Sequence, residues 1–423
     1  MTSAPTPPTE TSQAVTGVSK LSISILMIGL VTVGIGQSIL FAILPPAGRE
    51  IGFEEYQIAA IFTAAALAFI LVAPFWGRLS DRIGRKPLIV IGLYGYAVTT
   101  VAFAWFADLG MQRALTPLTV FVLLASSRLL YSLVASGIVP ASQAYMADCT
   151  DGEKRMAGMA GVQASYSLGM ILGPGLVPIS IGLGLMAPMY IAGIISAVAA
   201  TAVLFFVRES KRDHGADLSM PRLRLRDPRI WAYMTVGFGF FVCMAGLQQI
   251  AAFYYQDILK LTSEETAGKV GTDLIFASVA AIATQITVMR YKQIPVRTLL
   301  ICGFICSILS LSILMTAENG IQMTGALIVF GIALGVIAPA FMTGATLAVS
   351  QAEIGAVSGL ATAAQGAAYV VGPLMMASLY QVSMLAPFIV EIIICVLLLI
   401  FTLRTIRAPA EAAISSESQM EKT

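Results

Sequence analysis

Charge, histidine and nucleotide-binding motifs are scarce in this chain of 423 residues. Only 11% of the residues are Asp, Glu, Lys or Arg, and His214 is the one histidine. The five cysteines show no CxxC spacing, which argues against a disulfide framework or a cysteine metal site. No G-x-x-x-x-G-K-S/T loop occurs, and no grouping of acids or serine with histidine suggests catalysis. We therefore expect neither an ATP-driven pump nor an enzyme, with no metal and no cofactor.

Apolar residues make up 57% of the chain and lie in long blocks, such as 21–44, 57–76 and 230–252. About 20 apolar residues in a helix suffice to cross roughly 30 Å of hydrocarbon. Charged clusters and Pro/Gly stretches divide these blocks into twelve predicted helices, starting near residues 21, 55, 87, 117, 154, 183, 230, 266, 296, 321, 354 and 383. The sequence thus predicts an all-α membrane protein, with the lipid bilayer as a partner. The first block lacks a basic n-region and a cleavage site, so we expect it to remain in the mature protein.

Basic residues fall mostly on one side of these predicted helices. The loops that would face outward carry only Arg49, Arg113, Lys260 and Lys269 of the 25 Lys and Arg residues, and Arg128 lies within a span. Because basic loops stay in the cytoplasm, the pattern predicts a multi-pass protein of the inner membrane with both termini cytoplasmic. The net charge of +2 gives no sign of a nucleic-acid partner.

A polar insert at residues 208–229 divides the chain into two halves that resemble each other. Three proline anchors recur at one constant offset: Pro140 with Pro339, Gly173-Pro174 with Gly372-Pro373, and Ala187-Pro188 with Ala386-Pro387. Such repeats place a binding site near the membrane midplane between the halves. We predict a disordered cytoplasmic N-terminus at 1–20, six-helix bundles at 21–208 and 230–407, a linker at 209–229 and a cytoplasmic tail at 408–423.

The loop between the second and third predicted helices sets one carboxylate among glycines and cations. Its candidate residues for a conformational switch are Gly77, Arg78, Asp81, Arg82, Gly84, Arg85 and Lys86. The loop resembles the signature of major facilitator superfamily transporters, and with the helix pattern and the repeat the resemblance covers roughly residues 20–407. It implies the major facilitator fold and a contact of Asp81 with the positive end of the eleventh helix, near Ile354. The alternative is a solvated basic loop that only sets orientation.

Arg128 lies about 11 residues from the outer start of the fourth helix, roughly 16 Å deep in the membrane. An arginine there costs about 2.5 to 3.5 kcal/mol even on insertion scales, so a partner or a watery cavity is expected. The segment from Arg128 to Gly137 is similar to a family motif linked to proton transfer. The alternative is that Arg128 only ties helices together.

Small residues and a proline cluster in the fifth helix, at Gly169, Gly173, Pro174 and Gly175. They permit close helix approach and a bend, and we expect a hinge. The pattern resembles the motif of drug:proton antiporters in this superfamily and so favours export, although Val177-Pro178 replaces the usual paired glycines. Close packing without directional meaning is the alternative.

Proton coupling needs a group that changes charge inside the membrane. Glu391 is the one acid well within a predicted span, so we take Glu391 with Arg128 as the candidate coupling pair. Glu391 could instead pair locally, since the twelfth helix is usually peripheral in this family.

Amides and aromatic hydroxyls are expected to line the substrate cavity, where they suit neutral or amphipathic ligands. The candidates are Gln37, Gln143, Gln163, Tyr166, Gln248, Gln249, Gln285, Gln365 and Tyr369. Contacts between helices are the alternative for each single glutamine.

These features together predict a monomeric secondary transporter that exports small organic molecules such as drugs or metabolites by proton antiport. An uptake carrier for a sugar or organic acid, and a non-transporting membrane sensor, remain as alternatives.

Overall fold

The structure, a computed structural model, describes residues 20–150, 153–209, 223–224, 227–291, 294–350 and 353–406. The N-terminal half contains α1 (Lys20–Ile51), α2 (Glu55–Ile83), α3 (Arg85–Met111), α4 (Pro117–Ala135), α5 (Ile138–Cys149), α6 (Glu153–Ser180), the 3-10 turn η1 (Ile181–Leu183) and α7 (Ala187–Phe206). The C-terminal half contains α8 (Trp231–Leu259), α9 (Ser263–Arg290), α10 (Val296–Met315), α11 (Gly320–Leu347), α12 (Ile354–Val382) and α13 (Ala386–Thr405). Within this described part, 12 helical spans are long and apolar enough to cross a membrane, which confirms the predicted all-α fold.

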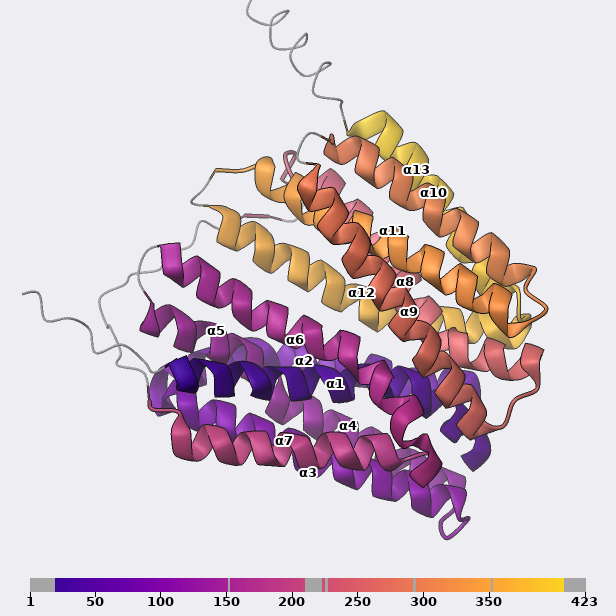
Figure 1. Ribbon diagram of the computed structural model, residues 1–423, viewed down its shortest axis with the longest axis horizontal. Helices are drawn as coiled ribbons and strands as arrows, with labels where there is room; N and C mark the ends of the chain where they lie inside the picture. The colour runs from indigo at the N-terminus through magenta and orange to yellow at the C-terminus, as the bar shows by residue number, and fades with distance from the viewer. Residues whose placement is uncertain are drawn as a thin grey trace, which may run out of the picture.

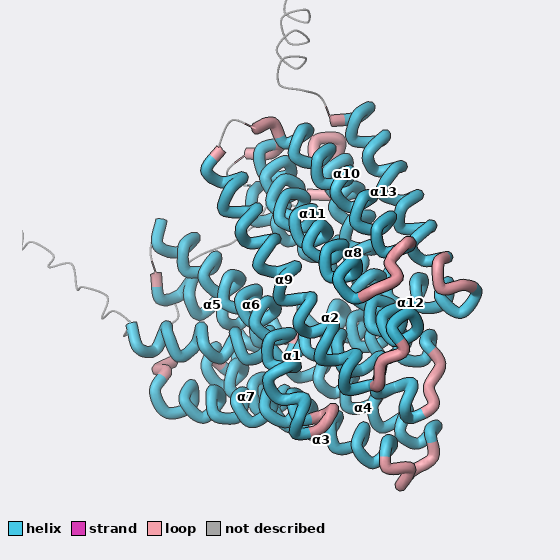
Figure 2. Tube along the Cα trace, turned by 45° about the vertical axis from the view of Figure 1, so that its right-hand side comes forward, coloured by secondary structure: helices cyan, strands magenta, loops and turns pink. Residues whose placement is uncertain are grey.

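The helices form two groups that follow the chain order, α1–α7 in indigo to magenta and α8–α13 in pink to yellow (Figure 1). In the first group α1 packs mainly on α6 and α3 on α7, and in the second α8 packs on α12 and α10 on α11. Within each group the helix axes are roughly aligned, and consecutive spans run in opposite directions (Figure 1 and Figure 2). We call the face where α1 begins and α13 ends the inner face, and the opposite face the outer face.

The fourth predicted helix is not continuous. It ends as α4 at Ala135, and α5 starts at Ile138 after a turn. Pro140 has no N–H to donate to the carbonyl of Ser136, so the helical hydrogen bond at this point is lost. Pro339, its counterpart in the repeat, lies inside the unbroken α11. The same proline anchor therefore breaks one helix and is accommodated in the other.

The two halves share their apolar core near the outer face. One cluster of buried side chains combines residues 39–62 of α1 and α2 with side chains from α8 to α13. A second cluster, which includes Leu26, Leu88, Tyr145 and Val203, belongs to the N-terminal half alone and lies toward the inner face. The halves are therefore joined through the outer part of the bundle.

Candidate functional site

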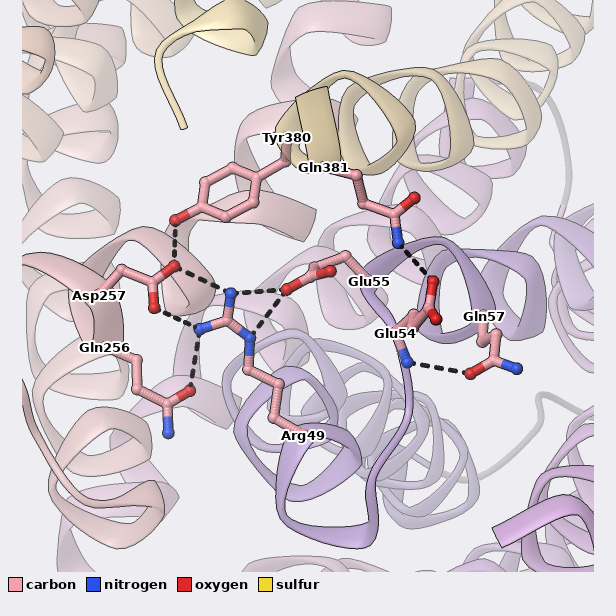
Figure 3. A network of polar contacts seen from close by, with 8 residues as sticks. All are labelled: Arg49, Glu54, Glu55, Gln57, Gln256, Asp257, Tyr380 and Gln381. Atoms are coloured by element: carbon pink, nitrogen blue, oxygen red, sulfur yellow. Dashed lines mark hydrogen bonds and ion pairs between the residues drawn. The ribbon is translucent and has the colours of Figure 1, made fainter. Parts of the chain in front are cut away.

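Arg49, at the outer end of α1, connects the two halves (Figure 3). Its guanidinium donates to both carboxylate oxygens of Asp257 on α8, at 2.8 and 2.9 Å, and to Glu55 on α2 at 2.6 and 3.1 Å. It also lies over the ring of Phe253, 4.8 Å from the centroid. One cation thus bridges an acid of its own half and an acid of the other half.

The acids of this outer network have further partners (Figure 3). Tyr380 on α12 donates to Asp257 at 2.6 Å, within the C-terminal half. Gln381 donates to Glu54 at 3.0 Å, across the halves. The hydroxyl of Ser263, at the start of α9, donates to the carbonyl of Pro46 across the halves as well. We call the contacts of Arg49, Glu55, Asp257 and Tyr380 the outer latch.

Arg128 lies deep in the N-terminal half with only 3% of its surface exposed. Its guanidinium donates to the side-chain oxygen of Gln37 on α1 at 2.9 Å and lies 4.4 Å from the ring centroid of Tyr131. Its Nε has no hydrogen-bond partner. The titratable groups around it are the phenols of Tyr131, Tyr96 and Tyr166, and none of the ion pairs between described side chains includes Arg128.

Two aromatic side chains extend this cluster toward the other half. Tyr369 on α12 donates to Gln248 on α8 at 3.2 Å, and its ring lies 6.2 Å from that of Phe41 on α1. Tyr369 also lies near Tyr166 on α6, close enough for the two phenol groups to interact electrostatically. The group around Arg128 therefore reaches the other half through α1 and α6, at Tyr369 of α12.

The remaining predicted cavity residues do not all join this group. Gln143 on α5 and Gln365 on α12 are half-buried, while Gln163 and Gln285 are exposed. Gln249 is completely buried, and its amide nitrogen and oxygen have no partner. Successive side chains on a helix point about 100° apart, so Gln248 and Gln249 face different surroundings.

Glu391 is completely buried within the C-terminal half, and both of its carboxyl oxygens lack a partner. Its side chain faces α8, because a Cβ added to Gly246 would lie 2.8 Å from Oε1. The thiol of Cys243 lies 3.9 Å from the Glu391 carbonyl oxygen. Glu391 therefore sits behind α8 rather than among the residues that surround Arg128.

A second buried carboxylate, Asp273 on α9, has the opposite environment. It accepts from the Lys269 ammonium at 2.7 Å, from Tyr255 at 2.8 Å and from Thr324 at 2.9 Å. These bonds tie α8, α9 and α11 together. Loss of either partner of a buried, hydrogen-bonded ion pair is strongly destabilising. Asp273 therefore has the features of an acid that stabilises the fold and keeps its charge.

The predicted hinge glycines lie at close helix crossings. A Cβ on Gly169 or Gly173 would collide with carbonyl oxygens of α1. The next residues face the other half: a Cβ on Gly175 would touch Ile275 of α9 at 3.4 Å, and one on Gly271 would lie 2.8 Å from the carbonyl oxygen of Pro174. α6 is thus packed tightly within its own half and is also in contact with α9.

The loop between α2 and α3 is held by its backbone and by an ion pair with α5. Gly84, at φ 104°, occupies a conformation that residues with a Cβ rarely adopt. Glu209 accepts from the backbone N–H groups of Arg85 and Lys86 at 2.8 and 3.3 Å. The Arg85 side chain pairs with Asp148 of α5 at 3.2 Å. Arg82 is exposed.

The side chains at positions 77, 78 and 81 lie outside the described part, so the expected contact of Asp81 with α12 stays a prediction. The start of α12 itself carries an acid, Glu353, which pairs with Arg229 at 2.9 Å. The bonds from Arg229 and from Ser350 lower the pKa of Glu353 to about 2.

Sequence reasoning did not single out Arg49. Arg49 was one of only four basic residues predicted on the outer side, and a basic residue in so rare a position could have indicated a specific role. Asp257 lies near the outer end of α8, and nothing in a single sequence shows that it meets Arg49.

The Major Facilitator Superfamily profile matches residues 26–291 and 273–422. The chain therefore belongs to this family of transporters, and it is not an enzyme.

Relatives with curated names are similar to part of the chain. Multidrug resistance protein 2 of Bacillus subtilis is 30% identical over 186 residues, which is 44% of each chain. The class B tetracycline resistance protein of Escherichia coli is 29% identical over 197 residues, or 46% of this chain and 45% of that protein. The chain thus spans about half the length of the curated relatives it matches.

The fold is similar to that of a solved transporter. The crystal structure of a bacterial homologue of the human lysosomal transporter Spinster, in an inward-facing and occupied conformation, superposes with a TM-score of 0.72. The match covers 92% of this chain and 98% of that one at 13% identity. The major facilitator fold is therefore confirmed.

Proposed function

We propose that this transporter exports small organic molecules, as a drug or metabolite efflux carrier, by proton antiport with alternating access. The observation that carries this proposal is the polar and aromatic cluster that begins at Arg128 in the N-terminal half and extends through Phe41 to Tyr369 of the other half. The similarity to proteins named for multidrug and tetracycline resistance supports export.

Alternating access requires contacts that break without leaving charges unpaired. Arg49 bonds to Asp257 across the halves and to Glu55 within its own half. Asp257 in turn keeps Tyr380, a partner within its half. If the halves separate at the outer face, each charged group therefore retains one hydrogen-bond partner, which lowers the cost of opening. The outer latch has the properties of a reversible closure.

The core distribution supports the same proposal. The halves share buried side chains near the outer face, while the inner part of the N-terminal half has its own core. We infer that this is the state closed to the outside. Tight crossings of α1 with α6, and of α8 with α12 at Gly372, would let each half move as a rigid body. The hinge would lie at Pro174 and Gly175, and the loop from Gly77 to Lys86 would be the inner switch.

Glu391 is our candidate proton carrier. An ionised carboxylate that is buried without any donor costs several kcal/mol, so the proton-bound form suits this position. Asp273 has no such need, because its charge is fully compensated. Arg128 would contribute a fixed positive charge to coupling.

The basic loops favour an inner membrane location with cytoplasmic termini. We propose that the protein works as a monomer, with the substrate and protons as its partners.

Proton movement in energised inverted vesicles tests the function. A pH-sensitive dye is quenched by the acid lumen, and cationic, neutral and anionic aromatic compounds are added in turn. We expect one class to restore fluorescence, since protons leave the lumen as the compound enters, and Glu391→Gln to abolish the response. A compound that increases quenching would indicate symport and would contradict export.

A further inference from the structure

Arg128 is a buried cation without a counter-ion among the described residues. Its one hydrogen bond goes to the neutral amide of Gln37, and its Nε has no partner. The groups that surround it are neutral phenols. The other described arginine near a half interface, Arg49, has two carboxylates. A buried guanidinium normally pairs with an acid, because its charge is otherwise poorly compensated.

The partners that Arg128 does have leave part of its charge uncompensated. The ring of Tyr131 provides a cation–π contact at 4.4 Å, and such contacts are weaker than pairing with a carboxylate. The amide oxygen of Gln37 accepts a single bond. A guanidinium has five N–H donors in a planar fork that fits a carboxylate with two parallel bonds.

Two of the residues that surround Arg128, Gln37 and Tyr166, lie on helices that reach the other half. Gln37 and Tyr166 keep part of their surfaces accessible, and they lie on α1 and α6, which contact α8 and α9 of the other half. Tyr166 has Tyr369 of α12 as a neighbour. A ligand that reached Arg128 from this interface would meet aromatic rings first and a positive charge at the end.

We propose that Arg128 and Gln37 form a subsite for the negatively charged group of the transported molecule, and that the substrate class is aromatic or amphipathic organic anions. This inference rests on the proposed export function but assigns its substrate. The carboxylate of the ligand supplies the counter-ion that the chain lacks. The rings of Tyr166 and Tyr369 pack on its apolar part.

Equilibrium binding to the purified, full-length protein tests this without transport. The probes are 2-naphthoate and 2-naphthamide, which share size and ring system but differ in charge. One charge-assisted contact corresponds to about a tenfold difference in affinity, so we expect naphthoate to bind at least about tenfold more tightly than naphthamide. Equal affinities in the wild-type protein would overturn the proposal, whatever the variants do.

Two substitutions test whether the preference for naphthoate depends on the positive charge of Arg128. Gln37→Glu is nearly isosteric and places an acid 2.9 Å from Arg128; we expect it to remove the preference for naphthoate while the protein stays folded. Arg128→Gln should do the same, and Arg404→Gln, at an exposed position of the peripheral α13, is the matched control that should keep the preference. A naphthoate preference that survives Gln37→Glu would contradict the assignment.

The buffer anion distinguishes a subsite for organic anions from a subsite for halides. Binding of naphthoate should be the same in gluconate and in chloride buffers. Loss of binding in chloride would assign the subsite to a halide and overturn the substrate class. Since these measurements need no proton gradient, a failed anion preference leaves the export proposal intact, and failed proton antiport leaves the binding result intact.

Discussion

Replacement of Asp257 by asparagine should open the outer face, because it removes the charge that holds Arg49 across the halves. The guanidinium bonds to both Asp257 oxygens at 2.8 and 2.9 Å. The two side chains are 20% and 27% exposed, so solvent screens the pair in part. We take about 1 to 2 kcal/mol for its contribution, which corresponds to about a five- to thirty-fold shift toward the outward-open state.

The matched control is Glu55→Gln. Glu55 bonds to the same guanidinium, at 2.6 Å, but belongs to the same half as Arg49. Both substitutions remove one negative charge beside Arg49, and only one removes a contact between halves. We therefore expect Glu55→Gln to leave the open population unchanged or to lower it.

Distances between spin labels report the populations. Gln112 follows α3 in the N-terminal half and Glu318 precedes α11 in the C-terminal half; both are exposed at the outer face. Cysteines at these sites, in a background without native cysteines, should show a longer distance component in Asp257→Asn. The reasoning is refuted if Asp257→Asn and Glu55→Gln give the same distance distribution.

Three further outcomes follow from the packing and the charges. Gly169→Ala should lower the melting temperature and the folded yield because its Cβ would collide with a carbonyl of α1, whereas Gly325→Ala, with open space around it, should not. Asp273→Asn should cost about 2 to 3 kcal/mol, seen as a lower melting temperature, because three donors lose a charged acceptor. The pKa of Glu353 is lowered to about 2 by Arg229, so its pairing stabilises the fold above its ordinary pKa of 4.5 and is lost as pH falls toward 2. Melting temperatures measured across that range should therefore fall less steeply in Glu353→Gln, and equal slopes would contradict the pairing.

The spans were predictable because apolar runs long enough to cross a bilayer leave few alternatives. The start of α2 at Glu55 and that of α4 at Pro117 coincide with the predicted positions. The break between α4 and α5 was not predicted, although Pro140 was recognised as an anchor. One proline has different effects in two helices, since the result depends on packing around it.

The candidate site was only partly accessible to sequence reasoning. The depth of Arg128 follows from its position along a helix, but its neutral surroundings do not. Gln163 and Gln249 were both predicted from the sequence to line the cavity. The structure places Gln163 at the surface and Gln249 in the core. Rotation of a helix about its axis decides such differences, and it is set by partners that are distant in the chain.

Accumulation of a labelled compound in inverted vesicles under an imposed pH gradient tests the central claim most directly. The account predicts that the compound accumulates when the lumen is acidic and stops accumulating when the gradient is collapsed. Glu391→Gln should then retain exchange of labelled for unlabelled compound but lose accumulation against a concentration gradient. Accumulation that is independent of the pH gradient, or that requires an alkaline lumen, would contradict proton antiport.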